Sequence, residues 1–133
     1  TLKHNTVEQN KESGIIISDR AKPTLDTNTV RLNDGSGFLY FDDSGGFALN
    51  SICDENTWYG FEFQNQSKPL IDGNICKLNL KAGFALFDQS SPILQNNQSL
   101  QNDDGFYIEE TANPTLTNNI ARDNLSMDMD DRR

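Results

Sequence analysis

The chain has 133 residues and a formal net charge of −9, with 20 acidic and 11 basic residues. This length predicts a single domain. Because the Lys and Arg residues are scattered and form no basic cluster, we expect neither nucleic acid nor an anionic membrane surface as a partner. No apolar run is long enough to span a bilayer.

Glycine recurs along the chain at an almost fixed interval. Gly14, Gly37, Gly60 and Gly83 are each 23 residues apart, and Gly105 follows after 22 residues. A fixed period of this size is typical of solenoids and other repeat architectures. With each glycine as position 1, the chain begins at position 11 of an incomplete unit. The complete units are 14–36, 37–59, 60–82 and 83–104, and a last one begins at residue 105.

Each unit predicts three short strands separated by turns. Apolar residues alternate at positions 2 and 4, and further apolar or small residues occupy positions 12 and 17, which is the period-two pattern of strands with one face inside. A turn-forming residue at position 10 excludes a helix there. The position 2 and 4 pairs are Ile15/Ile17, Phe38/Tyr40, Phe61/Phe63, Phe84/Leu86 and Phe106/Ile108, and position 10 is Pro23, Gly46, Pro69, Pro92 and Pro114.

Two positions of the unit are asparagine almost without exception. Stacked asparagines can hydrogen-bond through their side-chain amides, which keeps a buried polar residue paired. We also expect these asparagines to adopt the left-handed backbone conformation of a sharp corner. Position 20 is Asn10, Asn33, Asn56, Asn79, Asn102 and Asn124, and position 15 is Asn5, Asn28, Asn74, Asn97 and Asn119, with Ser51 as the exception.

These positions predict a coil of three strands, stacked in parallel and in register on the next coil with a rise of about 4.8 Å. The segments SKPLIDGNICKLN and TANPTLTNNIARDN resemble the right-handed parallel β-helix repeat. That repeat occurs in pectate-lyase-like enzymes, in periplasmic copper-accessory proteins of nitrous oxide reductase and in F-box-type ubiquitin-ligase subunits. The resemblance implies an all-β, right-handed parallel β-helix solenoid of about five coils of 23 residues. We expect a repeat domain at 1–124, a charged tail at 125–133, and a place in a longer solenoid or assembly.

The outward face of the first strand carries apolar residues where a solvated face would be polar. A contiguous exposed apolar area usually marks a contact surface. We hypothesise that this strip contacts a protein partner or further coils of the parent protein; alternatively, a turn or tail of the chain covers it. The strip consists of Ile16, Leu39, Phe41, Phe87 and Tyr107, and it is interrupted at Glu62 and Gln64.

Carboxylates recur at position 6, where Asp42 and Asp88 would lie about 9.6 Å apart, a separation that suits an inverting glycosidase. Aspartate is also favoured at a turn for backbone reasons, so we prefer a solvated turn column and assign no catalytic residue. The only histidine, His4, lies at the N-terminal edge, and no loop has metal-ligand spacing, so we expect no metal or cofactor. The full column reads Asp19, Asp42, Asn65, Asp88 and Glu110.

Two aromatic residues and two cysteines complete the candidates. Trp58 and Tyr59, at a turn, are able to stack on a sugar ring or to cap the turn locally. Cys53 and Cys76 share position 17 and are predicted to be buried thiols, with Cβ atoms further apart than a disulfide prefers; a bridge or a metal site is the alternative. Reduced thiols favour a cytoplasmic location.

Two functions follow from the resemblance. The F-box likeness implies a non-catalytic module that serves as a rigid protein-interaction scaffold, with substrate recognition in a larger protein. The pectate-lyase likeness implies a polysaccharide-binding or polysaccharide-cleaving module; an enzyme of this kind would be a lyase or glycoside hydrolase. An apolar, acid-poor exterior strip favours protein contact, whereas a groove with carboxylates, a basic residue and aromatic rings favours sugar.

Overall fold

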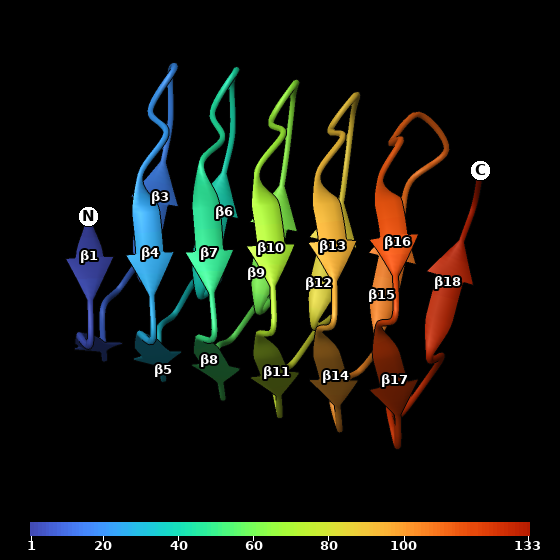
Figure 1. Cartoon of the computed structure of the whole chain (residues 1–133). Helices are drawn as coiled ribbons and strands as arrows, with labels where there is room; N and C mark the ends of the chain where they lie inside the picture. Colours follow the sequence, from blue (N-terminus) through green and yellow to red (C-terminus); the bar gives the residue numbers. More distant parts are fainter.

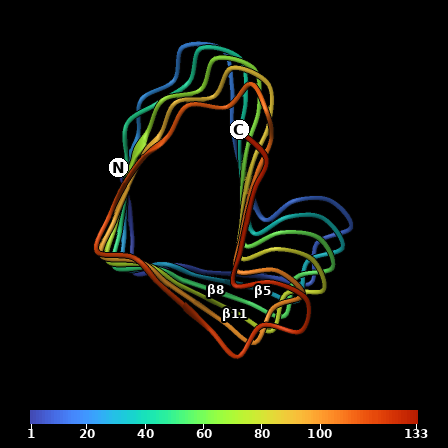
Figure 2. The same cartoon turned by 90° about the vertical axis from the view of Figure 1, so that its right-hand side faces the viewer.

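The computed structural model describes all 133 residues, and its regular structure consists entirely of short strands. They form three parallel sheets of six strands each, so that the chain makes about six turns of a solenoid (Figure 1). Viewed along the axis, the stacked coils enclose one interior (Figure 2). The structure contains no helix that could cross a membrane.

Each sheet takes one strand from every coil. Sheet A contains β1 (Leu2–Lys3), β4 (Thr24–Asp26), β7 (Phe47–Leu49), β10 (Leu70–Asp72), β13 (Ile93–Gln95) and β16 (Thr115–Thr117). Sheet B contains β2 (Thr6–Glu8), β5 (Thr29–Arg31), β8 (Ile52–Asp54), β11 (Ile75–Lys77), β14 (Gln98–Leu100) and β17 (Ile120–Arg122). Sheet C contains β3 (Ile15–Ile17), β6 (Phe38–Tyr40), β9 (Phe61–Phe63), β12 (Phe84–Leu86), β15 (Phe106–Ile108) and β18 (Met129–Asp131).

The predicted three strands per coil and their parallel, in-register pairing are confirmed, but the expectation of about five coils was too low. The additional turn comes from the two ends: residues 1–13 supply β1 and β2, and the segment 125–133, which we expected to be a tail, supplies β18. Strand β18 pairs with β15 through Phe106 and Met129. The pattern is hard to recognise there because Asp128 stands at the glycine position and Asp131 at an apolar one.

The core is built from columns of equivalent side chains. The rings of Phe38, Phe61, Phe84 and Phe106 stack in sequence, with centroid distances of 4.3, 5.5 and 4.9 Å and planes within 9° of parallel. All four rings are buried, and stacked pairs contribute stability beyond the burial of area. The period-two pattern therefore predicted the inner face of sheet C correctly.

Both asparagine ladders are present inside the corners. Asn56 Nδ2, for example, donates to Asn79 Oδ1 at 3.0 Å and to the carbonyl oxygen of Val30 at 3.1 Å. The left-handed conformation, however, belongs to the residue before each ladder asparagine, such as Asn96 (φ 56°) before Asn97 and Leu78 (φ 55°) before Asn79. This preceding residue turns the chain, and the ladder asparagine then directs its amide into the interior.

The glycine period has a packing cause. A Cβ atom at Gly60 would lie 2.6 Å from the Sγ atom of Cys76, because the position 17 side chain packs directly against position 1. Cys53 and Cys76 are neighbours in sheet B, and both are fully buried free thiols, which confirms their predicted place in the interior. Burial raises the pKa of the Cys53 thiol.

Candidate binding groove

The corners between sheets B and C form a projecting wall beside the outer face of sheet C (Figure 2). Successive corners are joined by backbone hydrogen bonds: Trp58 N donates to Gly35 O at 3.2 Å, and Lys81 N donates to Trp58 O at 3.0 Å. Asp103 N in turn donates to Lys81 O at 3.0 Å. Because every coil contributes one stacked corner, the wall runs parallel to the solenoid axis.

Two hollows of about 290 Å³ each lie between this wall and sheet C, and we call them together the sheet C groove. One is lined by Tyr59, Lys81, Ala82, Phe87, Asp103, Asp104 and Tyr107. The other is lined by Lys11, Glu12, Ser13, Asp34, Gly35, Leu39, Trp58, Glu62 and Gln64. The two hollows meet at one corner of the wall, because Trp58 lines one of them and its neighbour Tyr59 lines the other.

Aromatic rings form a row across the first hollow. Tyr59 meets Phe87 edge to face at a centroid distance of 5.6 Å, and Phe87 lies 5.4 Å from Tyr107. The ammonium group of Lys81 lies 5.8 Å from the ring centroid of Trp58 and 5.9 Å from that of Tyr59. The groove thus combines aromatic surface with a cation held above it.

Carboxylates lie on the same surface. Glu62 is only 4% exposed although it points outward from β9, and it accepts hydrogen bonds from Ser36 Oγ at 2.5 Å and Gln64 Nε2 at 2.6 Å. Desolvation raises the pKa of the Asp104 carboxyl, and the nearby charge of Asp103 adds to this effect. Burial also raises the pKa of the Tyr59 hydroxyl, with a contribution from the Glu62 carboxylate.

The predicted exterior strip is divided between the groove and open surface. Leu39, Phe87 and Tyr107 line the hollows, and Phe41 is half-buried just beyond the end of β6. Ile16 is 51% exposed. Ala85, at the equivalent position of β12, is fully buried, so the strip is interrupted there as well as at Glu62.

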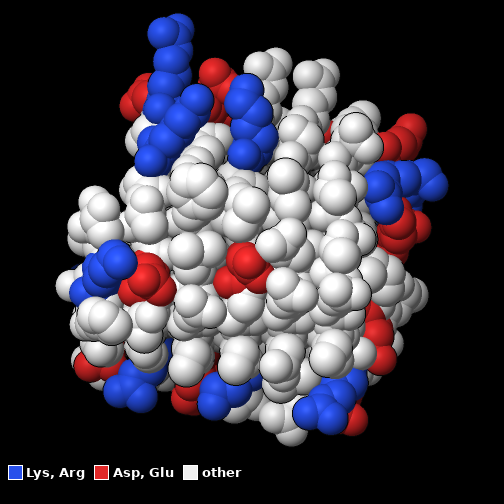
Figure 3. Space-filling view, in the orientation of Figure 1, with Lys and Arg blue, Asp and Glu red and all other residues white.

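Large apolar side chains are also exposed outside the strip, where no prediction had placed them. Phe47 is 47% and Ile93 42% exposed on sheet A, whose outer face carries few charges (Figure 3). Basic groups at the margins of that face lie close to acidic ones (Figure 3). Lys68 pairs with Asp43 at 2.7 Å, for example.

The side chains of the acidic turn column at position 6 accept hydrogen bonds from backbone N–H groups of the preceding coil. Asp42 N donates to Asn65 Oδ1 at 3.1 Å, Asn65 N to Asp88 Oδ2 at 2.8 Å, and Asp88 N to Glu109 Oε2 at 2.7 Å. The column therefore ends in Glu109 and not in Glu110 as expected, because the longer glutamate side chain reaches the rung from one residue earlier. These bonds support the turn interpretation over a catalytic pair.

The hollow beside this column has a volume of about 530 Å³ and no hydrophobic lining residue. No group of three or more His, Cys, Asp or Glu side chains is arranged to hold a metal ion, and His4 is an exposed turn residue with φ 57°. The sheet C groove is therefore the better candidate site. Sequence reasoning did not single out Lys81 or Asp104 and treated Glu62 only as an interruption of the exterior strip, because corner and outer positions do not repeat one residue type.

Comparisons with known proteins agree with this architecture. The family described as "Right handed beta helix region" matches residues 1–126. A crystal structure of a double mutant of the periplasmic alginate epimerase AlgG is similar with a TM-score of 0.62 and 17% identity, over 96% of this chain and 39% of that chain. No curated protein sequence matched the chain. Neither match bears on the finer likeness to F-box-type or copper-accessory proteins. The chain belongs to the right-handed β-helix family.

Proposed function

We infer that the sheet C groove binds a carbohydrate chain. The observation that carries this proposal is the row of Tyr59, Phe87 and Tyr107 beside the carboxylates of Asp103 and Asp104 and the ammonium group of Lys81. Aromatic rings present flat apolar surface to the C–H faces of a sugar. Carboxylates accept hydrogen bonds from its hydroxyl groups, and ammonium donates to them.

The repeat also suits a linear polymer. Equivalent positions recur at the strand spacing of about 4.8 Å along the axis, so a chain lying parallel to the wall would meet aromatic and polar groups in several successive coils. The fold is similar to that of the periplasmic alginate epimerase AlgG, and a polysaccharide as ligand agrees with this similarity. At 17% identity, this similarity is evidence for the fold alone. The proposal that the ligand is a carbohydrate depends on the residues of the groove.

Binding without turnover is the form of the proposal that we favour. The one outward carboxylate that is deeply buried, Glu62, already holds Ser36 and Gln64 through its two oxygens. The acids of the turn column accept backbone N–H groups. Neither arrangement pairs a proton donor with a proton acceptor across the groove, as sugar cleavage would require.

A microarray of plant, algal and microbial polysaccharides tests the proposal. We expect the wild-type chain to retain at least one polysaccharide, and Phe87→Ala or Tyr107→Ala to weaken retention about tenfold because each removes a ring from the row. Ile120→Ala, which truncates an exposed side chain on sheet B, is the matched control and should bind like wild type. If no polysaccharide is retained, the proposal is wrong.

Protein contact is the second candidate, and the exposed apolar groups favour it. Ile16 and Phe47 are each about half exposed, and the charge-poor face over sheet A is broad (Figure 3). A scaffold of this kind would bind through the strip that includes Leu39 and Phe41. Replacing Ile16 and Phe41, two residues of the strip that line neither hollow, with serine should then abolish partner binding while polysaccharide retention is unaffected.

A further inference from the structure

The charge of the sheet C groove narrows the ligand class. Only two cationic side chains line its hollows, Lys11 and Lys81. Five carboxylates line the same hollows, namely Glu12, Asp34, Glu62, Asp103 and Asp104. A ligand chain lying in the groove would therefore face a surface with an excess of negative charge.

The nearby cations do not reverse this balance. Lys81 is held over the rings of Trp58 and Tyr59. The guanidinium group of Arg132 lies 4.8 Å from the Tyr107 ring, but it also pairs with the Asp130 carboxylate at 2.8 Å. Lys11 lines the other hollow, the one that includes Trp58, and the other charged residues that line it are all acidic. In the hollow beside Phe87, desolvation raises the pKa of the Asp104 carboxyl, and the charges of Asp103 and Asp130 add to this effect, which agrees with several acidic groups lying close together there.

Resting on the carbohydrate-binding function proposed above, we propose that the groove selects a neutral polysaccharide and rejects polyuronates. A polyuronate carries one carboxylate per sugar, and within a few ångströms of the groove acids this repulsion is not fully screened at physiological salt. The hydroxyl groups of a neutral sugar instead donate to those acids, and hydrogen bonds to ionised acceptors are the stronger kind. Alginate, which the name of the similar epimerase mentions, is a polyuronate. The excess of acidic groups in the groove therefore argues against alginate as the ligand of this chain.

The test compares neutral and acidic chains on one array at 150 mM NaCl. The neutral probes are galactomannan, xyloglucan, β-1,3-glucan and fully methyl-esterified homogalacturonan; the acidic probes are alginate and de-esterified homogalacturonan. The two forms of homogalacturonan share a backbone and differ in charge. We expect at least one neutral probe to be retained and every acidic probe to bind at least tenfold more weakly.

A charge-reversed variant supplies the second arm. Glu12 and Asp34 are exposed on the projecting wall and accept no side-chain hydrogen bond, so Glu12→Lys with Asp34→Lys should leave the fold intact. We expect this double variant to gain about tenfold on acidic probes at 50 mM NaCl, whereas Glu12→Gln with Asp34→Asn gains less. Acidic probes that bind wild type as tightly as neutral ones would overturn the selectivity and leave carbohydrate binding standing. Retention of neither class overturns both proposals.

Discussion

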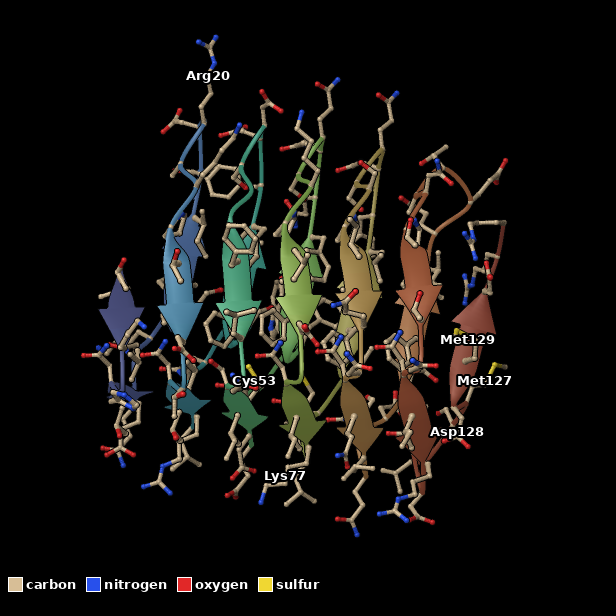
Figure 4. All side chains as sticks on the ribbon, viewed as in Figure 1. Arg20, Cys53, Lys77, Met127, Asp128 and Met129 are labelled. Carbon is tan, nitrogen blue, oxygen red and sulfur yellow. The ribbon has the colours of Figure 1, made fainter.

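The side-chain carboxylate of Asp128 accepts a hydrogen bond of 2.8 Å from Nδ2 of Asn124, the last asparagine of the second ladder. It also accepts the backbone N–H of Asn124 at 3.4 Å. In the coils before it, both of these donors reach the Oδ1 atom of the next asparagine, as Asn79 N and Nδ2 do with Asn102. Asp128 therefore replaces the next rung with its own acceptor, at the C-terminal end of the solenoid (Figure 4).

Replacing Asp128 tests this terminal acceptor. We expect Asp128→Ala to lower the free energy of unfolding by about 1 kcal/mol, because two donors lose their partner at a partly solvated site. Asp128→Asn keeps a side-chain oxygen and should stay close to wild type. Urea unfolding of the three proteins gives the comparison. Equal losses for alanine and asparagine would mean that the charge, and not the acceptor, stabilises this end.

The interior of the first ladder offers a sharper comparison. Asn74 Oδ1 accepts the N–H of Ser51 at 2.9 Å, and Asn74 Nδ2 donates to the carbonyl oxygen of Ala48 at 2.8 Å. Asn74→Leu would leave the buried Ser51 N–H without a partner, and we expect a loss of about 2–4 kcal/mol in unfolding free energy.

The matched control for that variant is Asn74→Ser. The hydroxyl oxygen of Ser51 already accepts Asn28 N at 3.1 Å in the same ladder, so a serine rung is tolerated by the column. We expect Asn74→Ser to cost less than half of the loss caused by leucine. If the apolar variant were the more stable of the two, the ladder would contribute packing and not hydrogen bonds.

Glycine at position 1 allows a test of the packing that sets the period. An added Cβ atom at Gly60 would lie 2.6 Å from both Cys76 Sγ and the carbonyl oxygen of Gly83. We expect Gly60→Ala to destabilise the chain by about 1–3 kcal/mol through overpacking. Gly45→Ala is the control, because its nearest heavy atom would be 3.4 Å away, and it should change stability by less than about 1 kcal/mol.

A second substitution separates the contact with sulfur from the other close contacts of an added Cβ atom at Gly60. Cys76→Ala removes the sulfur atom but leaves its own Cβ atom, at 2.9 Å, and the Gly83 carbonyl oxygen in place. The double variant should therefore recover part of the stability lost in Gly60→Ala, and complete recovery would contradict the backbone contact. Thermal unfolding monitored by circular dichroism is sufficient to rank wild type, Gly60→Ala, Cys76→Ala and the double variant by stability.

The interior was predictable from the sequence because equivalent positions of successive coils have the same packing and hydrogen-bonding requirements. Gly60 and its equivalents admit no Cβ atom, and each ladder asparagine needs its own copy as partner, so these positions repeat one residue type. The groove has no such constraint. Lys81 and Asp103 stack in one corner column and differ in charge, and only the folded structure brings them beside Phe87. Strand β18 was missed because Asp128 stands where the other coils have glycine, and because its carboxylate, not another asparagine, accepts the hydrogen bonds of Asn124.

The ion pair that follows β18 predicts a pH dependence. The Arg133 guanidinium donates to the Asp131 carboxylate and lowers its pKa from 3.8 to about 2. A carboxyl group with a lowered pKa stabilises the folded state at pH above its unfolded value, and this contribution is lost as the pH falls from about 4 through 2. Carboxyl NMR of Asp131 measures the pKa, and Arg133→Gln should return it towards 3.8.

Hydrogen exchange follows the consequence for the strand. The Arg132 N–H donates to the carbonyl oxygen of Ile108 at 3.0 Å, so its protection reports whether β18 is docked. We expect this protection to fall between pH 4 and 2 in wild type and to be lower at pH 6 in Asp131→Asn. High salt should reduce the difference, because about a third of each side chain of the pair is exposed to solvent. An Asp131 pKa near 3.8 in wild type would contradict the prediction.

One core substitution is expected to stabilise the chain. The Tyr40 hydroxyl is fully buried and has no hydrogen-bonding partner among the protein atoms, and desolvation raises its pKa strongly. Phe63, the equivalent residue of the next coil, stacks on Tyr40 at 5.7 Å and shows that a phenyl ring fits this column. Tyr40→Phe should therefore raise the unfolding free energy by about 1 kcal/mol. The reverse change, Phe63→Tyr, should lower it. If Tyr40→Phe were destabilising in urea unfolding, the hydroxyl would have a polar partner such as a bound water, and the column would need that partner to fold.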